Sequence, residues 1–221
     1  MTITQYASVF CLATTLPLFS QTTTTILLAE VDGAVQSSGA LGLSVVDDEF
    51  NATIRSGGSN IRQSVYEFNL AGIGTDRTVL GAYFEVDTRA VSNTGTNPVI
   101  LRLDGYTGDG SITVGDFDMG EAAGGTLLSN FSLVVGDSGS TSLALEILDF
   151  SPLQAAITND EDYFGIRTET DNFAFFQVSS LENTFGDAAP SLRIVLAPVP
   201  EPSSLLLGVL GVIGIFWRRA R

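Results

Sequence analysis

Histidine and lysine are both absent from this chain of 221 residues, and all ten of its basic residues are arginines. Without histidine, the chain can supply neither a Ser-His-Asp or Cys-His catalytic arrangement nor a histidine ligand for zinc. Without lysine, it has no Schiff-base or Ser-Lys chemistry. Catalysis by a pair of carboxylates, as in glycosidases, is still compatible with the composition, because 25 acidic residues are present.

Cysteine is nearly absent as well. Cys11 is the single cysteine, so no disulfide can form within one chain. It lies in the apolar stretch 7–19, which has the length of the hydrophobic region of a secretory signal. No basic residue precedes this stretch and no Ala-x-Ala site follows it, although Ser20 is small enough for a cleavage site. We predict a secretory signal region over residues 1–25, with the mature start within residues 20–30.

Charge is divided unevenly along the chain. Residues 1–197 carry 24 acids and 7 arginines, a net charge of −17, whereas residues 198–221 carry one acid and three arginines, a net charge of +2. A strongly acidic body repels nucleic acid, so we expect no nucleic-acid partner. Neutral glycans, cations and basic proteins are compatible with this charge.

The last two dozen residues combine three unlike pieces. Prolines at positions 198, 200 and 202 favour an extended linker. The uncharged run 205–217 would form a helix of about 20 Å, against a bilayer core of about 30 Å. With two preceding serines, it predicts a short transmembrane helix over residues 203–217 in the inner membrane. The clustered basic residues that follow predict a cytoplasmic end: Arg218, Arg219 and Arg221.

The order of these pieces resembles a known family. The segment Val-Pro-Glu-Pro-Ser at positions 199–203, the short apolar helix and the terminal arginines are similar to the PEP-CTERM sorting signal of exopolysaccharide-producing bacteria. The resemblance implies that an exosortase, a membrane protease, recognises Pro200, Glu201 and Pro202. It also implies removal of the helix and transfer to the cell surface or extracellular matrix. A permanent anchor or a buried terminal helix would be the alternative, and the short apolar run favours the removable signal.

Between the termini, apolar residues alternate as they do in strands with one buried face. Four sets show this pattern: Leu80, Ala82, Phe84 and Val86; Val99, Leu101 and Leu103; Leu143, Leu145 and Ile147; Leu192, Ile194 and Leu196. Residues 65–68 and 173–178 are bulky on both faces, which predicts either central strands or strands that lie under a loop. Residues 152–158 predict one short helix, with Ser151 as its N-cap. The expected fold over residues 26–197 is an all-β antiparallel sandwich, jelly-roll-like.

Several segments of this region are also similar to DNRLRE-like secreted β-sandwich modules. They are Arg-Gln-Ser-Val-Tyr-Glu-Phe-Asn at 62–69, Gly-Tyr-Thr-Gly-Asp-Gly at 105–110, Phe-Ser-Pro-Leu at 150–153, and the closing pair at 179–182 and 190–194. Gly74 stands where that family has a proline. The resemblance implies a jelly-roll module of the carbohydrate-binding type over residues 27–196.

One stretch suggests a metal site. Residues 104–118 place four carboxylates on a glycine-rich loop: Asp104, Asp109, Asp116 and Asp118. Hard oxygen ligands of this kind suit Ca²⁺. An EF-hand match fails, because its first position is Gly105 and its twelfth is aspartate rather than glutamate. A plain hairpin turn and a sandwich-type calcium site both remain open, and no other cofactor is expected.

Two further groups of residues have a functional and a structural interpretation. Glu67 and Glu85 could form a glycosidase-type pair, but solvent-facing residues or partners of Arg62 and Arg89 are the simpler expectation. The aromatic residues Tyr163, Phe164, Phe173, Phe175 and Phe176 could stack on a sugar, or could belong to the core.

These observations together predict an exported, non-enzymatic surface or matrix protein, with a binding or structural role in exopolysaccharide or biofilm. A polysaccharide and the processing exosortase are the expected partners. The alternatives are an extracellular carbohydrate-active enzyme that uses two carboxylates, and a protein adhesion module.

Overall fold

The computed structural model describes residues 21–38, 42–46, 50–56, 60–93, 98–117, 125–133, 141–170, 174–181 and 187–199. The expected C-terminal helix 203–217 lies outside these residues. So does the expected signal region up to residue 20, whereas residues 23–25 belong to the first strand. Within the described ranges, no helix is both long enough and apolar enough to cross a membrane.

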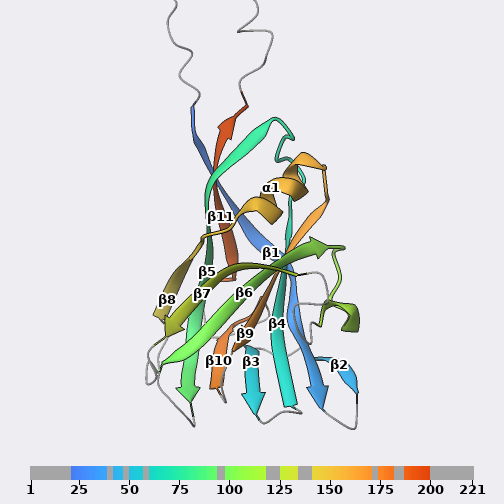
Figure 1. The fold of residues 1–221 in the computed structure, drawn as a ribbon, viewed down its shortest axis with the longest axis vertical. Helices are drawn as coiled ribbons and strands as arrows, with labels where there is room; N and C mark the ends of the chain where they lie inside the picture. The colour runs from blue at the N-terminus through green and yellow to red at the C-terminus, as the bar shows by residue number, and fades with distance from the viewer. Residues whose placement is uncertain are drawn as a thin grey trace, which may run out of the picture.

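Eleven antiparallel strands, one α-helix and one single-turn 3-10 helix make up the described fold (Figure 1). Their bounds are β1 Thr23–Ser38, β2 Leu43–Val46, β3 Phe50–Ser56, β4 Asn60–Asn69, β5 Arg77–Asn93, β6 Val99–Gly108, η2 Val114–Asp116, β7 Thr126–Leu133, β8 Thr141–Ile147, α1 Ser151–Thr158, β9 Tyr163–Thr170, β10 Ala174–Ser179 and β11 Ser191–Pro198. The predicted all-β antiparallel sandwich with one short helix is therefore confirmed.

Two long strands, β1 and β5, frame the sheet. At one end β11 lies between them, pairing with Thr23–Leu28 of β1 and with Arg77–Glu85 of β5. At the other end β4, β3 and β10 lie between them, so the sheet fans out downward in Figure 1. A bulge in β1 between Ala29 and Val31 marks the point where β1 changes partner from β11 to β4.

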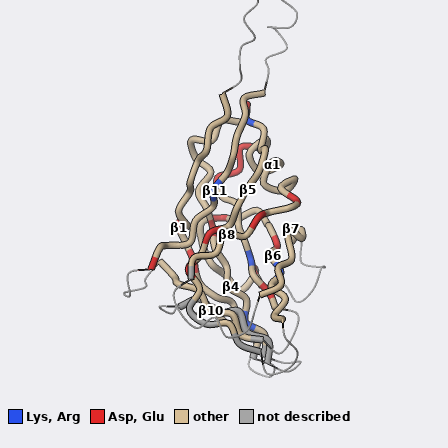
Figure 2. The backbone as a smooth tube through the Cα atoms, turned by 90° about the vertical axis from the view of Figure 1, so that its left-hand side faces the viewer, with Lys and Arg blue, Asp and Glu red and all other residues tan. Residues whose placement is uncertain are grey.

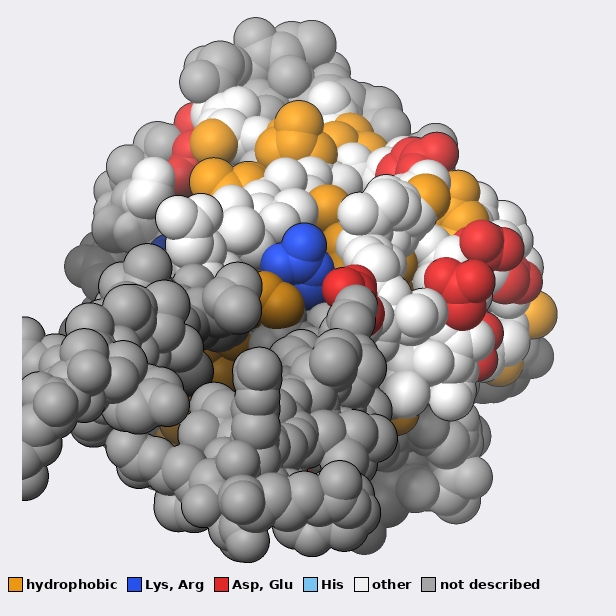
Figure 3. Space-filling model, turned by 90° about the horizontal axis from the view of Figure 1, so that it is seen from above, with side chains coloured by type: hydrophobic (Ala, Val, Ile, Leu, Met, Phe, Trp, Pro, Cys, Tyr) orange, Lys and Arg blue, Asp and Glu red, His pale blue; other side chains and the backbone are white. Residues whose placement is uncertain are grey.

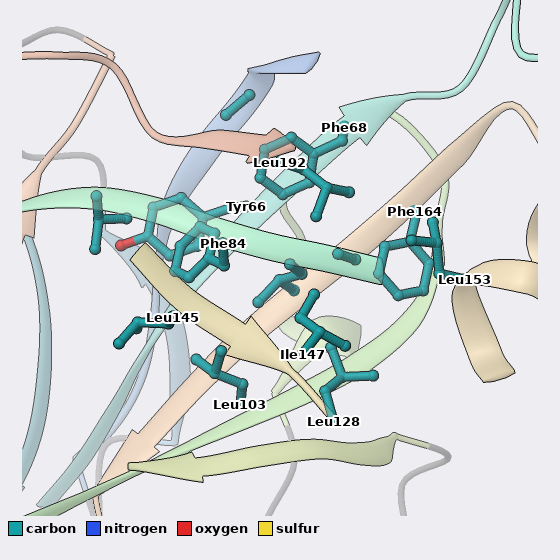
Figure 4. Close-up of a cluster of buried hydrophobic side chains, with 14 of the residues drawn as sticks. Tyr66, Phe68, Phe84, Leu103, Leu128, Leu145, Ile147, Leu153, Phe164 and Leu192 are labelled. Atoms are coloured by element: carbon teal, nitrogen blue, oxygen red, sulfur yellow. The ribbon is translucent and has the colours of Figure 1, made fainter. Parts of the chain in front are cut away.

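The sheet then curls to make a second layer. Strands β9, β6 and β7 continue in order from β4, and β8 pairs with the outer edge of β5. The layer closes between β7 and β8, where the backbone N–H groups of Leu148 and Asp149 both donate to the Leu128 carbonyl. The main hydrophobic core fills the space between the layers, with Phe84 near its centre (Figure 4). Its ring centroid lies 5.0 Å from that of Tyr66 and 6.2 Å from that of Phe68.

The alternating pattern of the sequence is confirmed in three sets and in most of the fourth. Val99, Leu101, Leu103, Leu192, Ile194, Leu196, Leu145 and Ile147 are buried, and Leu143 packs against the core. Leu80 was expected to face inward with Ala82, but it is 52% exposed and Val79 is buried instead. The reason is a bulge: Val195 pairs with Gly81 and Leu196 pairs with Val79, so Leu80 is the extra residue. An extra residue in a strand shifts the alternation by one position, so the side chains beyond the bulge point to the opposite face of the sheet.

Strand β4 is buried on both faces, as its mixed pattern predicted. Tyr66 and Phe68 point into the main core, whereas Val65 belongs to a second cluster with Val35 and Phe117. Residues 108–117 form the cover over this outer cluster, because Ile112 packs against it and Phe117 is a buried member of it. The core of this protein therefore lies on both sides of one strand.

The short helix begins one residue earlier than predicted. Ser151 is its first residue rather than its N-cap, and the N-cap is Phe150 without a side-chain cap bond. Asp149 takes over part of the capping role, because its Oδ1 accepts the Ser151 N–H at 2.9 Å. Gln154 fixes the helix to β5, accepting the Val79 N–H at 2.7 Å and donating to the Arg77 carbonyl at 3.0 Å.

Removing the central aromatic side chain tests this description of the core. We expect Phe84→Ala to lower the free energy of unfolding by about 3–5 kcal/mol, because it leaves a cavity between the two layers. Urea unfolding followed by circular dichroism measures the change. Leu148→Ala is the matched control, because Leu148 is 71% exposed and its truncation should cost under about 0.5 kcal/mol. Equal effects of the two substitutions would contradict the placement of Phe84.

Candidate functional site

The two described ends of the chain leave the sheet side by side (Figures 1 and 2). Strand β1 begins at Thr23, which lies opposite Leu196 of β11. Strand β11 ends at Pro198 opposite Arg77, and the next N–H, that of Val199, donates to the Asp76 carbonyl at 2.8 Å. We call this end of the molecule the exit pole, defined by residues 21–25, 71–77 and 196–199.

A hollow of about 410 Å³ lies at the exit pole. Thr23 and Thr25 of β1 and residues 71–74 of the turn before β5 line it. Asp76 and Arg77 line it as well, and their charged groups are 3.7 Å apart. Figure 3 looks at the molecule from this end and shows hydrophobic side chains at the surface beside acidic and basic ones. The expected sorting residues Pro200, Glu201, Pro202, Arg218, Arg219 and Arg221 lie outside the described part of the chain.

The three described aspartates of the predicted calcium loop have separate local roles. Buried Asp104 accepts the Arg102 Nε–H at 2.9 Å. Asp109 Oδ1 accepts the backbone N–H of Ser111 at 3.0 Å and its hydroxyl at 2.7 Å. Asp116 Oδ2 accepts the Thr113 N–H at 2.6 Å, which completes a capping box at η2. Asp118 lies outside the described residues, and the residues that are described contain no group of three potential metal ligands. The calcium site stays a prediction.

Glu67 was expected to face solvent or to pair with Arg62, and this was wrong. It is fully buried on the outer face of β4, beneath residues 108–117. Its Oε1 accepts the Tyr106 hydroxyl at 2.9 Å and its Oε2 accepts the Gly110 N–H at 2.6 Å. Burial raises the pKa of the Glu67 carboxyl, and these two hydrogen bonds oppose that effect only in part. Burial and the nearby Glu67 carboxylate likewise raise the pKa of Tyr106.

Arg167 of β9 completes the polar layer under this loop. It is 2% exposed, its Nη1 donates to the Asp116 carbonyl at 2.9 Å, and its guanidinium lies 5.8 Å from the Tyr106 ring centroid. A Cβ atom at position 165 would meet the Tyr106 ring at 2.1 Å, so Gly165 is required for this ring to pack against β9. We name Glu67, Tyr106 and Arg167 the loop latch, because they hold residues 108–117 to the sheet.

Glu85 has a different partner from the expected Arg89. Its Oε1 accepts the Arg193 Nε–H at 2.6 Å, and the Arg193 guanidinium lies 4.2 Å from the Tyr83 ring centroid. Glu85 and Asp87 line a second hollow of about 310 Å³ between β5, β8 and residues 188–191. Asp87 is already engaged there, because its Oδ2 accepts the Ala188 N–H at 2.7 Å.

The proposed pair of Glu67 and Glu85 is not brought together in an open site. Glu85 lines the hollow beside β8, whereas Glu67 is buried beneath residues 108–117. The aromatic residues follow the core interpretation: Phe164 and Phe176 are buried, and Tyr163 and Phe175 are half-buried. Phe173 lies outside the described residues. Sequence reasoning missed the loop latch. The available signal was Gly108 and Gly165, because the first lets the Glu67 side chain approach closely and the second the Tyr106 ring.

Comparison with known families adds one finding to this geometry. Residues 198–220 match the PEP-CTERM protein-sorting motif. The motif indicates an exported protein that an exosortase sorts and processes, and its C-terminal segment is a membrane-anchored sorting signal. It begins at Pro198, the last residue of β11, so the sorting signal starts where the sheet ends. A comparison with curated proteins gives no match. The resemblance to DNRLRE-like modules stays a prediction.

The loop latch makes a prediction about pH. The folded-state pKa of Glu67 is raised, so the folded protein binds this proton at a higher pH than the unfolded chain does. The stabilising contribution of Glu67 is then fully present below the unfolded pKa and is lost as pH rises through the folded pKa. We expect the free energy of unfolding of the wild type, relative to Glu67→Gln, to increase as pH falls from neutral toward the ordinary glutamate range.

Urea titrations at several pH values measure this difference. Glu146→Gln is the control, because Glu146 is exposed on β8. The burial of the Glu67 carboxyl would be contradicted if the difference in free energy of unfolding between the wild type and Glu67→Gln did not change with pH, or grew as pH rises.

Proposed function

We propose that this chain is an exported protein whose acidic sandwich is released from its C-terminal anchor and then acts at the cell surface or in the extracellular matrix. Its role there is non-enzymatic, as a structural or binding module of exopolysaccharide material. The observation that carries the proposal is the junction at residues 198 and 199: the sorting motif begins at Pro198, the last residue of β11, and the last described hydrogen bond of the chain is made by the next residue, Val199.

The junction supports removal of the tail without loss of the fold. Every described strand and both hydrophobic clusters lie within residues 21–199. The last described backbone hydrogen bond at this end of the chain joins the Val199 N–H to the Asp76 carbonyl, just beyond β11. A cut anywhere beyond Val199 would therefore leave all of these contacts in place.

The same junction supports a position close to the membrane before processing. Only residues 200–204 separate Val199 from the apolar run that starts at Leu205. An extended chain of that length spans at most about 20 Å. The exit pole would face the membrane, and the expected N-terminal signal would reach the same membrane, because β1 also starts at this pole.

The surface chemistry supports a matrix role. The net charge of −17 over residues 1–197 disfavours nucleic acid and leaves hydroxyl-rich neutral polymers as compatible partners. Several carboxylates already serve the fold: Glu67 in the loop latch, Glu85 with Arg193, Asp87 with the Ala188 backbone, and Asp104 with Arg102. The competing function is a carboxylate enzyme, for which the hollow lined by Glu85 and Asp87 offers two carboxylates.

The sorting half of the proposal is tested by fractionation of cells that make an epitope-tagged full chain. We expect the wild type to yield a shortened product outside the membrane fraction, whereas Glu201→Ala stays in the membrane at full length because the motif is damaged. A chain ending at Val199 should appear outside the membrane directly. Glu146→Ala, an exposed glutamate on the folded domain, is the matched control and should behave as the wild type. Identical partitioning of all four proteins would refute processing at the motif.

The binding half is tested with exopolysaccharide from the producing cells. We expect residues 21–199 to sediment with the polymer and to release no new reducing ends. Glu85→Gln should not change the absence of turnover, since no catalysis is assigned to it. Release of reducing ends by the wild type, abolished in Glu85→Gln, would replace the binding function by the enzymatic one.

A further inference from the structure

The first strand has one open edge. Thr23–Leu28 of β1 pair with β11 on one side. The other partners of β1 start later, β4 at Ala29 and β2 at Ala34. Within the described residues, no strand pairs with the second edge of this segment. Such an edge presents backbone N–H and C=O groups that can accept another strand.

Nothing in the local sequence protects this edge. Natural edge strands usually carry charges, proline or a bulge that prevents pairing with another chain. Residues 21–29, Gln-Thr-Thr-Thr-Thr-Ile-Leu-Leu-Ala, contain neither a charge nor a proline. The bulge of β1 comes only after Ala29. Ile26 and Leu28 are 59% and 62% exposed, so the outward face of the open strand is apolar. Threonine, isoleucine and leucine in this pattern favour pairing with a further strand.

We propose that this edge pairs with the same edge of a second copy, antiparallel and about a two-fold axis. A two-fold contact needs only one self-complementary surface. Charge restricts where such a contact can form: two bodies of net charge −17 repel each other, and the neutral segment 21–29 is a place where they can approach without opposing carboxylates. The pairing also brings Ile26 and Leu28 of both copies onto one continuous face, where part of their exposed surface is buried.

The geometry links this pairing to release of the tail. Antiparallel pairing points the two exit poles in opposite directions. Residues 29–38 in β1 of one copy then extend about 33 Å beyond the exit pole of the other copy. The tether of residues 200–204 holds a membrane within about 20 Å of that pole. The paired copy would therefore overlap the membrane to which the first copy is anchored. Two anchored copies cannot pair in this way, so pairing follows removal of the C-terminal tail. This link rests on the proposed function, whereas the pairing itself does not.

Sedimentation velocity of residues 21–199 tests the pairing. We expect a concentration-dependent dimer, and we expect Ile26→Lys to raise its dissociation constant by at least about tenfold, because it places two like charges near the two-fold axis. Leu148→Lys is the matched control, because Leu148 is exposed but lies after β8, away from the open edge, and it should dimerise as the wild type does. Far-UV circular dichroism checks that Ile26→Lys is folded, and Leu28→Lys replaces it if it is not.

A single cysteine tests the direction of pairing. Antiparallel pairing centred on the segment puts the two residues at position 22 about 20 Å apart, so oxidised Thr22→Cys should not cross-link the dimer. Efficient cross-linking, monomers at every concentration, or an Ile26→Lys dimer as tight as the wild type would each overturn the proposal. None of these results would affect sorting, which is read separately from the ratio of full-length to shortened chain.

Discussion

The position of β11 in the sheet is the constraint on which the rest of this structure depends. Ser191–Pro198 lies between β1 and β5, so the last described strand of the chain is a central strand rather than an edge. A central strand contributes hydrogen bonds on both sides, and its buried residues Leu192, Ile194 and Leu196 belong to the main core. The sheet is therefore complete only when the chain up to Pro198 is available. All described strands end by Pro198, so the contacts of the described sheet involve no residue beyond Val199.

One carboxylate of this acidic domain lies in its interior, where the loop latch accommodates it. Glu67 is fully buried, which is rare for a glutamate. It is accommodated because Tyr106 and Gly110 donate to it and because Arg167 lies in the same polar layer. The result is a loop, residues 108–117, that covers a second hydrophobic cluster and holds β4 between two packed faces. Glu67, which could have been one of a catalytic pair, is thus part of this scaffold.

Sequence predicted the parts of the structure that follow local rules. Alternation predicted the facing of Val99, Leu101 and Leu103, and the Pro-Glu-Pro segment with its apolar run predicted the sorting motif. It failed where the outcome depends on contacts distant in sequence. The facing of Leu80 depends on a bulge opposite β11, and the partner of Glu85 is Arg193, more than one hundred residues away. The burial of Glu67 depends on a loop that folds back from β6, which no spacing within β4 could reveal.

The central claim is that the sheet, including β11, is independent of the tail. Native-state hydrogen exchange of the backbone amides of β11 tests it most directly, measured in the full chain and in a chain that ends at Val199. Amides of a central strand that is held by β1 and β5 should exchange only through global unfolding. The account predicts that β11 amides are protected to the same degree as those of β5 in both chains. Loss of β11 protection in the shorter chain, with β5 still protected, would contradict it.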